Sequence, residues 1–317
     1  MADKAEILTA FQSIRRAQIG GRYAPHKPLL ILLALGRVQR GEPRLVAFSA
    51  IDGEMKALLQ DFAPRSAVSS RHYPFWHLAT DGQGTIWDLM GPKDLLTRPP
   101  AATPSLGELR SRDVEGGFPP PIDDALRNVP GLIEAVAQQL LDSCFPETLH
   151  SDIAAAVGLR LDPVPQVGDA AADGVEYTDV RRARRDRTFR ERILRAYEYR
   201  CCVCGFDLRI GQTSAGLEAA HIRWHHLGGP DVEKNGLSLC ALHHKLFDLG
   251  VFTVEPMEQR VVYSQHAIAG DRGADGELRY HGRTLLPPQH PDLLPAPEFL
   301  GWNHDNVFKK PGRVFQP

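Results

Sequence analysis

The sequence lacks any apolar run that could cross a membrane. The longest one, LLILLALG at Leu29–Gly36, is far shorter than the roughly 20 residues that a membrane helix needs. The first sixteen residues also lack the charged start, apolar middle and small-residue cleavage site of a signal peptide. We therefore expect a cytoplasmic protein with no membrane contact.

An excess of either charge is also missing. The 37 basic and 39 acidic residues give a formal net charge of -2. The bulk charge therefore does not indicate a nucleic-acid-binding protein, although an average can conceal a local patch. The hydrophobic content of 43% and the charged content of 24% are those of a globular protein, and 317 residues suffice for two domains of ordinary size.

Cysteine is scarce, and its placement is uneven. Four of the five cysteines lie between residues 201 and 240, interspersed with histidines, while Cys144 stands alone in LLDSCFP. In a chain without an export signal, such a cluster favours a metal site over disulfides. Cys144 is expected to be a small buried residue.

Apolar spacing and turn residues divide the chain into two domains, for an expected fold class of α+β. Residues 1–150 should be rich in helix, and residues 151–180, which are small and almost free of aromatics, are interpreted as a linker to the second domain at 181–317. The first expected helix covers residues 4–19, and the second begins near Pro28 and stops at Gly36. The third covers residues 123–145, with a break at Pro130. The expected strands or short buried pieces are LVAFSA, HYPFWHLA and TIWDL.

A strongly basic segment leads into the second domain. Eight arginines lie between residues 181 and 195, while Phe189, Ile193, Ala196 and Tyr197 share one helical face. Nearly all the charge is positive, and a cluster of potential metal ligands follows directly. The segment therefore favours contact with a phosphate backbone over a merely solvated surface.

Two short pairs of ligands have the spacing of a zinc site. Cys201 and Cys204 form C-x-x-C, and Cys240 and His243 form C-x-x-H thirty-six residues after Cys204. A two-residue spacer lets a tight turn present both ligands of a pair to one tetrahedral ion. The sequence thus predicts a closed structural Zn²⁺ site. Cys202 lies out of register with both pairs and is expected to take no part.

The segment between and behind these pairs carries a second motif. His221 in AAHI, Asn235 in KNGLSLC and His244 behind the second pair follow one another in the order of an HNH nuclease, which this region resembles over about residues 185–265. The resemblance implies a ββα-metal fold. It also implies that His221 is the general base, that Asn235 braces the loop of His221 and that His244 holds a catalytic divalent cation such as Mg²⁺ or Mn²⁺.

One position departs from that family. Many members carry Asp directly before the base histidine as a second metal ligand, but here the residue is Ala220. Either His244 holds the ion with help from the phosphate, or Glu218 or Asp248 contributes a ligand.

The first 150 residues resemble a second family, the sulfur-binding domains of modification-dependent restriction enzymes. The resemblance rests on YAPHKPLLILLALGR, RHYPFWHL and RSRDVEGGFPPPI. Those domains recognise phosphorothioate DNA, in which sulfur replaces one non-bridging phosphate oxygen. By resemblance, Tyr73 and Pro74 line an apolar cup for the sulfur, while Phe75, Trp76 and Trp87 are expected in the core.

The same resemblance implies a set of polar DNA contacts. His26 and Lys27, at the start of a helix, would meet a phosphate or a base edge. Arg71 is expected to contact the DNA backbone. Members of that family also use an arginine before the GGF motif to read DNA, and here Arg110 and Arg112 are equally placed.

Together these features predict a restriction endonuclease that recognises phosphorothioate-modified double-stranded DNA and hydrolyses phosphodiester bonds nearby. The alternatives are an HNH endonuclease for methylated or unmodified DNA and a catalytically silent zinc DNA-binding protein. One active centre cuts one strand, so double-strand cleavage requires either a homodimer or two independent events.

Overall fold

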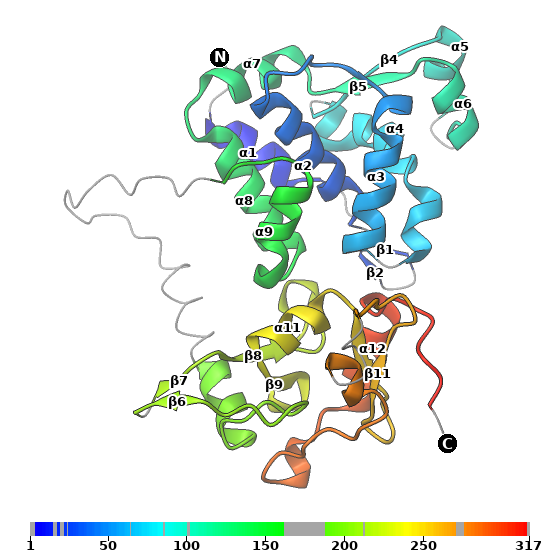
Figure 1. The fold of residues 1–317 in the computed structure, drawn as a ribbon. Helices are drawn as coiled ribbons and strands as arrows, with labels where there is room; N and C mark the ends of the chain where they lie inside the picture. The colour runs from blue at the N-terminus through cyan, green and yellow to red at the C-terminus, as the bar shows by residue number, and fades with distance from the viewer. Residues whose placement is uncertain are drawn as a thin grey trace, which may run out of the picture. The chain divides into compact units, whose positions relative to one another are not determined.

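The computed structural model describes residues 4–14, 18–19, 22–23, 25–63, 65–84, 86–99, 102–161, 188–211, 213–270 and 276–315. The chain divides into two compact units, Met1–Val164 (unit 1) and Pro165–Pro317 (unit 2). In Figure 1, unit 1 runs from blue to green and unit 2 continues to red. Within the described residues, none of the helices combines the length and the apolar character needed to span a bilayer.

Unit 1 consists mainly of helices with short strands between them, as expected for an α-rich domain. The helices are α1 (Lys4–Gln12), α2 (His26–Gln39), α3 (Phe48–Phe62), α4 (Tyr73–His77), α5 (Lys93–Leu96), α6 (Leu106–Ser111), α7 (Pro120–Asn128), α8 (Leu132–Cys144) and α9 (Glu147–Ala156), with the 3-10 turns η1 (Arg65–Ser70) and η2 (Leu78–Gly84). The strands are β1 (Gln18–Ile19), β2 (Arg22–Tyr23), β3 (Val46–Ala47), β4 (Asp88–Met90) and β5 (Glu115–Gly117).

Helix α2 forms the centre of unit 1. Its residues from Leu29 to Gly36 are all buried, and it packs against α3, α4, α7 and α8 (Figure 1). A helix that is apolar on every side is stable only inside a core. Its first residue, His26, is therefore fixed relative to the rest of the unit.

The GGF motif lies in a small three-stranded sheet of order β3-β5-β4. A Cβ at Gly116 would lie 2.7 Å from Nε1 of Trp87, and one at Gly117 would lie 2.0 Å from the carbonyl oxygen of Arg44. Both glycines are required because β5 passes too close to its neighbours for any side chain. The core assignments of Phe75 and Trp87 are confirmed, since their exposed fractions are 0% and 2%.

Several expected elements of unit 1 differ from those in the structure. Helix α1 ends at Gln12, well before residue 19, and HYPFWHLA contains the short helix α4 in place of a strand. Pro74 lies in the first turn of α4, where its missing N–H would be unpaired in any case. LVAFSA contributes only two strand residues before α3 begins, and no side chain caps that helix to mark its start.

The end of α2 and the start of the expected linker also differ from the prediction. Helix α2 continues beyond Gly36, so this glycine does not mark a helix end. It is needed for a close contact with the end of α9, because a Cβ there would lie 2.2 Å from the carbonyl oxygen of Val157. Residues 151–156 belong to α9 instead of an extended linker, and residues 162–180 lie outside the described residues. The break at Pro130, between α7 and α8, is confirmed.

Unit 2 is built around one ββα element. Strand β8 (Leu217–His221) pairs antiparallel with β9 (Gly236–Cys240), and α11 (Ala241–Asp248) follows at once (Figure 1). Residues 188–196 are helical. The remaining elements are β6 (Arg209–Ile210), β7 (Thr213–Ser214), β10 (Phe252–Val254), β11 (Val261–Tyr263), α12 (Pro297–Asn306) and the 3-10 turns η3 (His225–Leu227), η4 (Glu233–Asn235), η5 (Glu277–Tyr280) and η6 (Pro291–Leu293).

The helix at residues 188–196 is fixed by its apolar face. Phe189, Ile193, Ala196 and Tyr197 are buried in the core of unit 2, as their spacing predicted. Ile193 packs so closely on the start of β9 that a Cβ at Gly236 would lie 2.2 Å from it. The arginines at 181–187 lie outside the described residues, so their expected phosphate contact stays a prediction.

Candidate nuclease and DNA-reading sites

The four predicted zinc ligands come together in unit 2. One ligand atom from each of Cys201, Cys204, Cys240 and His243 lies within 4.8 Å of the other three. Sγ of Cys204 and Sγ of Cys240 are 4.0 Å apart, and Nδ1 of His243 is 3.6 Å from Sγ of Cys201. Tetrahedral zinc with its usual bond lengths separates two sulfurs by about 3.8 Å, and sulfur from nitrogen by about 3.6 Å. The geometry of the four side chains therefore fits zinc.

The surroundings distinguish these ligands from Cys202. Hydrogen bonds from the thiols of Cys201 and Cys204 hold the pKa of the Cys240 thiol well below its usual range, which favours the thiolate that a metal requires. Cys202 is fully buried outside the cluster, and burial raises the pKa of its thiol. It is not part of the group of four.

Sequence reasoning missed one carboxylate beside this cluster. Oε2 of Glu277, in η5, lies 2.9 Å from Nε2 of His243, the ring nitrogen that faces away from the sulfurs. The contact has the distance of an ion pair, although it is not aligned as a hydrogen bond. Acids in this position orient a metal-bound imidazole and raise its basicity. No fixed spacing links the two residues, so no sequence signal could have found Glu277.

His221 lies at the end of β8, opposite Gly236 of β9. Its ring stacks on Phe189 with 4.0 Å between centroids and 12° between planes. Nε2 lies 2.9 Å from Oδ1 of Asp231, and the side chain is 20% exposed. The histidine is thus accessible and held in one orientation, and Asp231 was not predicted.

Asn235 is fully buried and organises the loop that follows His221. Its Oδ1 accepts from the backbone N–H of Arg223 at 2.8 Å, and its Nδ2 donates to the carbonyls of Arg223 and Pro230, each at 3.0 Å. A Cβ at Gly229 would lie 1.8 Å from the Arg223 carbonyl oxygen, so the loop closes tightly around the amide. This is the bracing arrangement that the resemblance implied.

His244 faces two acids and points away from the zinc cluster. Its Nδ1 is 2.6 Å from Oε2 of Glu218 and its Nε2 is 3.3 Å from Oδ2 of Asp248. The hydrogen bond with His244 lowers the pKa of the Glu218 carboxyl, and Nε1 of Trp224 donates to the other oxygen of Asp248 at 3.2 Å. Both acids weighed as ligands in place of Asp at the buried position Ala220 therefore lie against His244.

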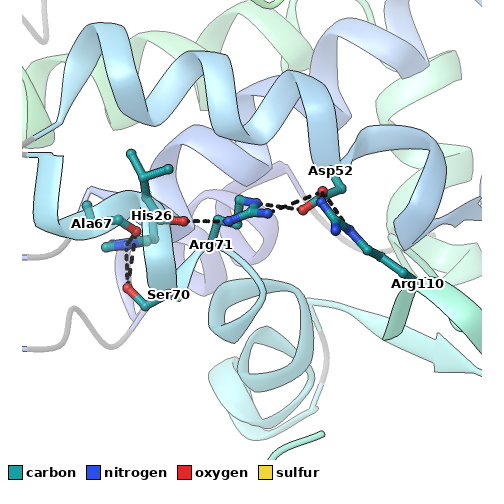
Figure 2. A network of polar contacts seen from close by, with 7 residues as sticks. His26, Asp52, Ala67, Ser70, Arg71 and Arg110 are labelled. Carbon is teal, nitrogen blue, oxygen red and sulfur yellow. Dashed lines mark hydrogen bonds and ion pairs between the residues drawn. The ribbon is translucent and has the colours of Figure 1, made fainter. Parts of the chain in front are cut away.

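In unit 1 the predicted DNA contacts lie at the start of α2, in α4 and just before it, and at the end of α6. Nε2 of His26 lies 2.8 Å from the carbonyl oxygen of Ala67 and 3.1 Å from Oγ of Ser70 (Figure 2). Burial lowers the pKa of His26, which favours a neutral ring. Lys27 donates to Oδ2 of the buried Asp81 at 2.6 Å. Both predicted residues therefore already have hydrogen-bond partners within unit 1.

Figure 2 shows that Arg71 and Arg110 share a single carboxylate, that of Asp52 in α3. Nε of Arg71 donates to Oδ1 at 2.7 Å, and Nε of Arg110 donates to Oδ2 at 2.9 Å. Arg71 also donates to the carbonyl of Val68 and its side chain is only 10% exposed, whereas that of Arg110 is 49% exposed. Arg112 instead makes a bidentate pair with Asp94 at the surface.

Tyr73 presents an exposed ring between two histidines. It is 47% exposed, and its ring centroid lies 4.4 Å from that of His72 and 6.0 Å from that of His77. His72 is buried, and burial lowers its pKa, as it does for His77. Pro74 is buried beside it. The surface at Tyr73 is therefore aromatic and flanked by rings that are weak bases.

Comparison with known proteins gives the class of each unit. Residues 4–162 match the model of the ScoMcrA-like DNA sulfur-binding domain, and residues 201–255 match that of an HNH endonuclease. Because the first match covers half of the chain, the chain belongs to the family with a ScoMcrA-like DNA sulfur-binding domain. It is a nuclease in which an HNH domain follows the sulfur-binding domain along the chain, and the Cys/His cluster of that domain fits a metal ion.

Solved structures give more distant likenesses. The sulfur-binding domain of ScoMcrA complexed with phosphorothioated DNA is 23% identical over 48% of this chain and 94% of that one, with a TM-score of 0.41. The corresponding SprMcrA complex is 22% identical over 50% and 95%, with a TM-score of 0.39. The type IV phosphorothioation-dependent restriction endonuclease ScoMcrA is 24% identical over 47% and 29%, with a TM-score of 0.35. No curated protein gives a significant match.

Proposed function

We propose that this protein is a phosphorothioate-dependent restriction endonuclease in which His221, Asn235 and His244 carry out hydrolysis. One observation carries the proposal. The three HNH residues each have the surroundings that phosphodiester hydrolysis requires, in a chain whose other unit belongs to a DNA sulfur-binding family. A silent zinc module would have no need of an accessible histidine beside an acid.

His221 is the general base in this proposal. A neutral imidazole accepts a proton at cellular pH, and the stacking on Phe189 fixes the plane of the ring. Asn235 keeps the following loop closed, so that His221 need not reorganise when DNA binds.

His244 and Glu218 would hold the catalytic cation, because Nδ1 of His244 and Oε2 of Glu218 lie 2.6 Å apart. An imidazole nitrogen and a carboxylate oxygen suit Mg²⁺ or Mn²⁺, and an ion there would replace the proton that lies between the two groups. A divalent cation would supply positive charge to the scissile phosphate and to the oxygen that leaves it. Asp248, at the other ring nitrogen of His244, is buried and braced by Trp224, so it would orient the imidazole.

The proposed sulfur-reading surface lies around Tyr73. Sulfur is larger, more weakly hydrated and a poorer hydrogen-bond acceptor than oxygen, so an apolar surface next to positive charge selects it. Tyr73 supplies the exposed apolar surface and the buried Pro74 supports it, and neither His72 nor His77 carries much charge near neutrality. Arg110 supplies an exposed cation, whereas Arg71 is buried and supports the surface from below.

The test compares cleavage of matched phosphorothioate and ordinary duplexes with Mg²⁺ or Mn²⁺. We expect the wild type to cut the modified duplex preferentially, and His221→Ala to abolish cleavage while leaving DNA binding intact. His290→Ala, at an exposed site in the same unit, is the matched control and should cut normally. Equal cleavage of both duplexes would favour a nuclease for unmodified DNA. Selective binding without cleavage by the wild type would leave a silent DNA-binding protein.

A further inference from the structure

His221 has a carboxylate partner that the HNH motif does not include. Its Nε2 lies 2.9 Å from Oδ1 of Asp231, ten residues later in the chain. A carboxylate can only accept a hydrogen bond, so Nε2 must carry the ring proton in this contact. That choice leaves Nδ1 as the nitrogen without a proton, which is the form that a general base needs.

The ring of His221 is fixed independently of this hydrogen bond. Phe189 stacks on one face with planes inclined by 12°, and it projects from the helix at residues 188–196. Rotation of the imidazole out of that plane would break the stack. The stack therefore fixes the plane of the ring, and within that plane Nε2 is the nitrogen that faces Asp231.

The same helix also holds the backbone of Asp231. The guanidinium of Arg192 donates to the carbonyl oxygen of Asp231, and its Nε lies 3.3 Å from Oε1 of Glu233. Asn235 holds the preceding carbonyl, that of Pro230, at 3.0 Å. Both partners of the His221–Asp231 contact are thus positioned by surroundings that do not depend on the contact itself.

We propose that Asp231 is a positioning residue for hydrolysis: it fixes His221 as the Nε2–H tautomer and directs Nδ1 toward the attacking water. The inference rests on the proposed function. The water proton passes to Nδ1, the water oxygen forms a bond to phosphorus, and the bond from phosphorus to the leaving oxygen breaks. The leaving alkoxide takes a proton from solvent. Asp231 stabilises the imidazolium of His221 until the ring releases the proton that it took from the water.

Few other charged groups face this pair among the described residues. His225 approaches the same carboxylate oxygen, with its Nε2 3.9 Å from Oδ1 of Asp231 and its ring 5.7 Å from that of His221. Arg192 contacts the backbone of Asp231 from the helix. Asp231 touches the His221 ring directly, so its removal should dominate any change in how His221 ionises.

The experiment uses the full-length, zinc-loaded protein and three variants. Asp231→Asn keeps the size of the side chain but offers an amide that donates to Nε2 and so favours the wrong tautomer. Asp231→Ala removes the partner. Glu233→Gln is the matched control, because it lies in the same loop and contacts Arg192 but not His221. Single-turnover cleavage, DNA affinity and the pH profile of the rate are measured for each.

We expect both Asp231 variants to cut about 10- to 100-fold more slowly than the wild type, with unchanged DNA affinity. The acidic limb of the rate profile should move to lower pH, because the carboxylate no longer favours the imidazolium. Nitrogen-15 NMR of labelled histidine should show the Nε2–H tautomer at His221 in the wild type and lose it in Asp231→Asn. Glu233→Gln should match the wild type throughout.

Three results would overturn the inference. They are an Nδ1–H tautomer in the wild type, wild-type rates and profiles in both Asp231 variants, or an equal loss of rate in Glu233→Gln, which would indicate a weakened loop. The NMR measurement needs no DNA. A wild-type protein that does not cut phosphorothioate DNA would therefore contradict the proposed function. The NMR measurement would still decide whether Asp231 fixes the tautomer of His221.

Discussion

Single carboxylates determine how the three candidate arginines of unit 1 are paired. Asp94 pairs with Arg112 through both oxygens, whereas Asp52 is shared between Arg71 and Arg110. One negative charge for two positive ones leaves a net positive charge on the Asp52 network. Arg110, half-exposed, carries that charge at the surface, so of the two arginines left open by the sequence it is the better placed to bind a phosphate.

The first prediction concerns Asp52→Asn. Burial alone would raise the pKa of Asp52, but hydrogen bonds and charge from Arg71 and Arg110 outweigh it and lower the pKa. A carboxyl whose pKa is lowered by folding adds stability above its unfolded pKa and loses it as the pH falls through the folded pKa. The variant should therefore melt well below the wild type at neutral pH, and the difference should shrink in acid.

Thermal melting across a pH series measures this, with Asp94→Asn as the control. Asp94 is exposed, and surface pairs contribute little to stability, so that variant should melt close to the wild type. A gap between wild type and Asp52→Asn that is the same at every pH would show that lost packing, rather than charge, is responsible.

Residues that follow a fixed spacing could be predicted, and their partners could not. The ligand pairs and the order of His221, Asn235 and His244 are properties of a short stretch of chain. Asp231, Glu277 and Asp52 have no such spacing, because their partners come from other elements. The same applies to Arg71, since nothing in the sequence indicates that α3 places an acid against it.

At the scale of elements, glycine was the least reliable signal. Gly36 and Gly53 both lie within helices, and the sequence alone does not indicate that their surroundings differ. In the structure Gly36 lies against the carbonyl of Val157, whereas a Cβ at Gly53 would have nothing within 4 Å. The end of α2 was missed for this reason. Helix α3 was not expected at all, and no side chain caps its start, while the break at Pro130 followed directly from the chemistry of proline.

The second prediction uses these two glycines as a matched pair. Gly53→Ala should stabilise unit 1 by about 0.5–1 kcal/mol, since alanine loses less backbone entropy on folding. Gly36→Ala should destabilise it by more than that gain, because the methyl group would lie 2.2 Å from a backbone oxygen. Chemical denaturation of both variants provides the two free energies of unfolding. Equal effects in the two variants would show that α2 can move away from α9 at little cost.

The third prediction concerns the zinc cluster, which links the turn at Cys201 to the first turn of α11. Cys204→Ser should lose zinc and lower the melting temperature of unit 2, because metal binding supplies part of its folding free energy. Glu277→Gln should keep zinc but bind it about 10- to 100-fold more weakly, as expected for a carboxylate behind a ligating imidazole. A chromogenic chelator in competition measures both affinities.

Cys202→Ser provides the matched control for this cluster. Cys202 is as buried as Cys201 but lies outside the group of four, so the variant should retain one equivalent of zinc even where the buried hydroxyl lowers its stability. A folded wild-type protein without bound zinc would refute the assignment of the cluster. Loss of zinc from Cys202→Ser would mean that the ligand set is wrong.

At the scale of the whole molecule, reading and cutting belong to units with separate cores. Tyr73 and Arg110 belong to unit 1, while His221, His244 and the zinc cluster belong to unit 2. The fold class and the division into two units could be predicted, because a segment of small residues almost free of aromatics separates the helix-patterned first half of the sequence from the paired ligands of the second. A change in one unit should then affect one activity and spare the other.

The last prediction tests this separation in the full-length chain. Tyr73→Ala should lower the preference for phosphorothioate over ordinary duplex by about 10- to 100-fold, since a buried aromatic contact contributes roughly 1.5–3 kcal/mol. Tyr73→Phe keeps the ring and should keep most of the preference. Cys204→Ser should bind with wild-type preference and cut neither duplex. Because Tyr73 is 47% exposed, its truncation should leave the melting temperature of unit 1 nearly unchanged. If Cys204→Ser also loses the preference, or if Tyr73→Ala slows cleavage of a duplex already bound at saturation, the two units act as one, and the sulfur contact must then control the cutting step as well as binding.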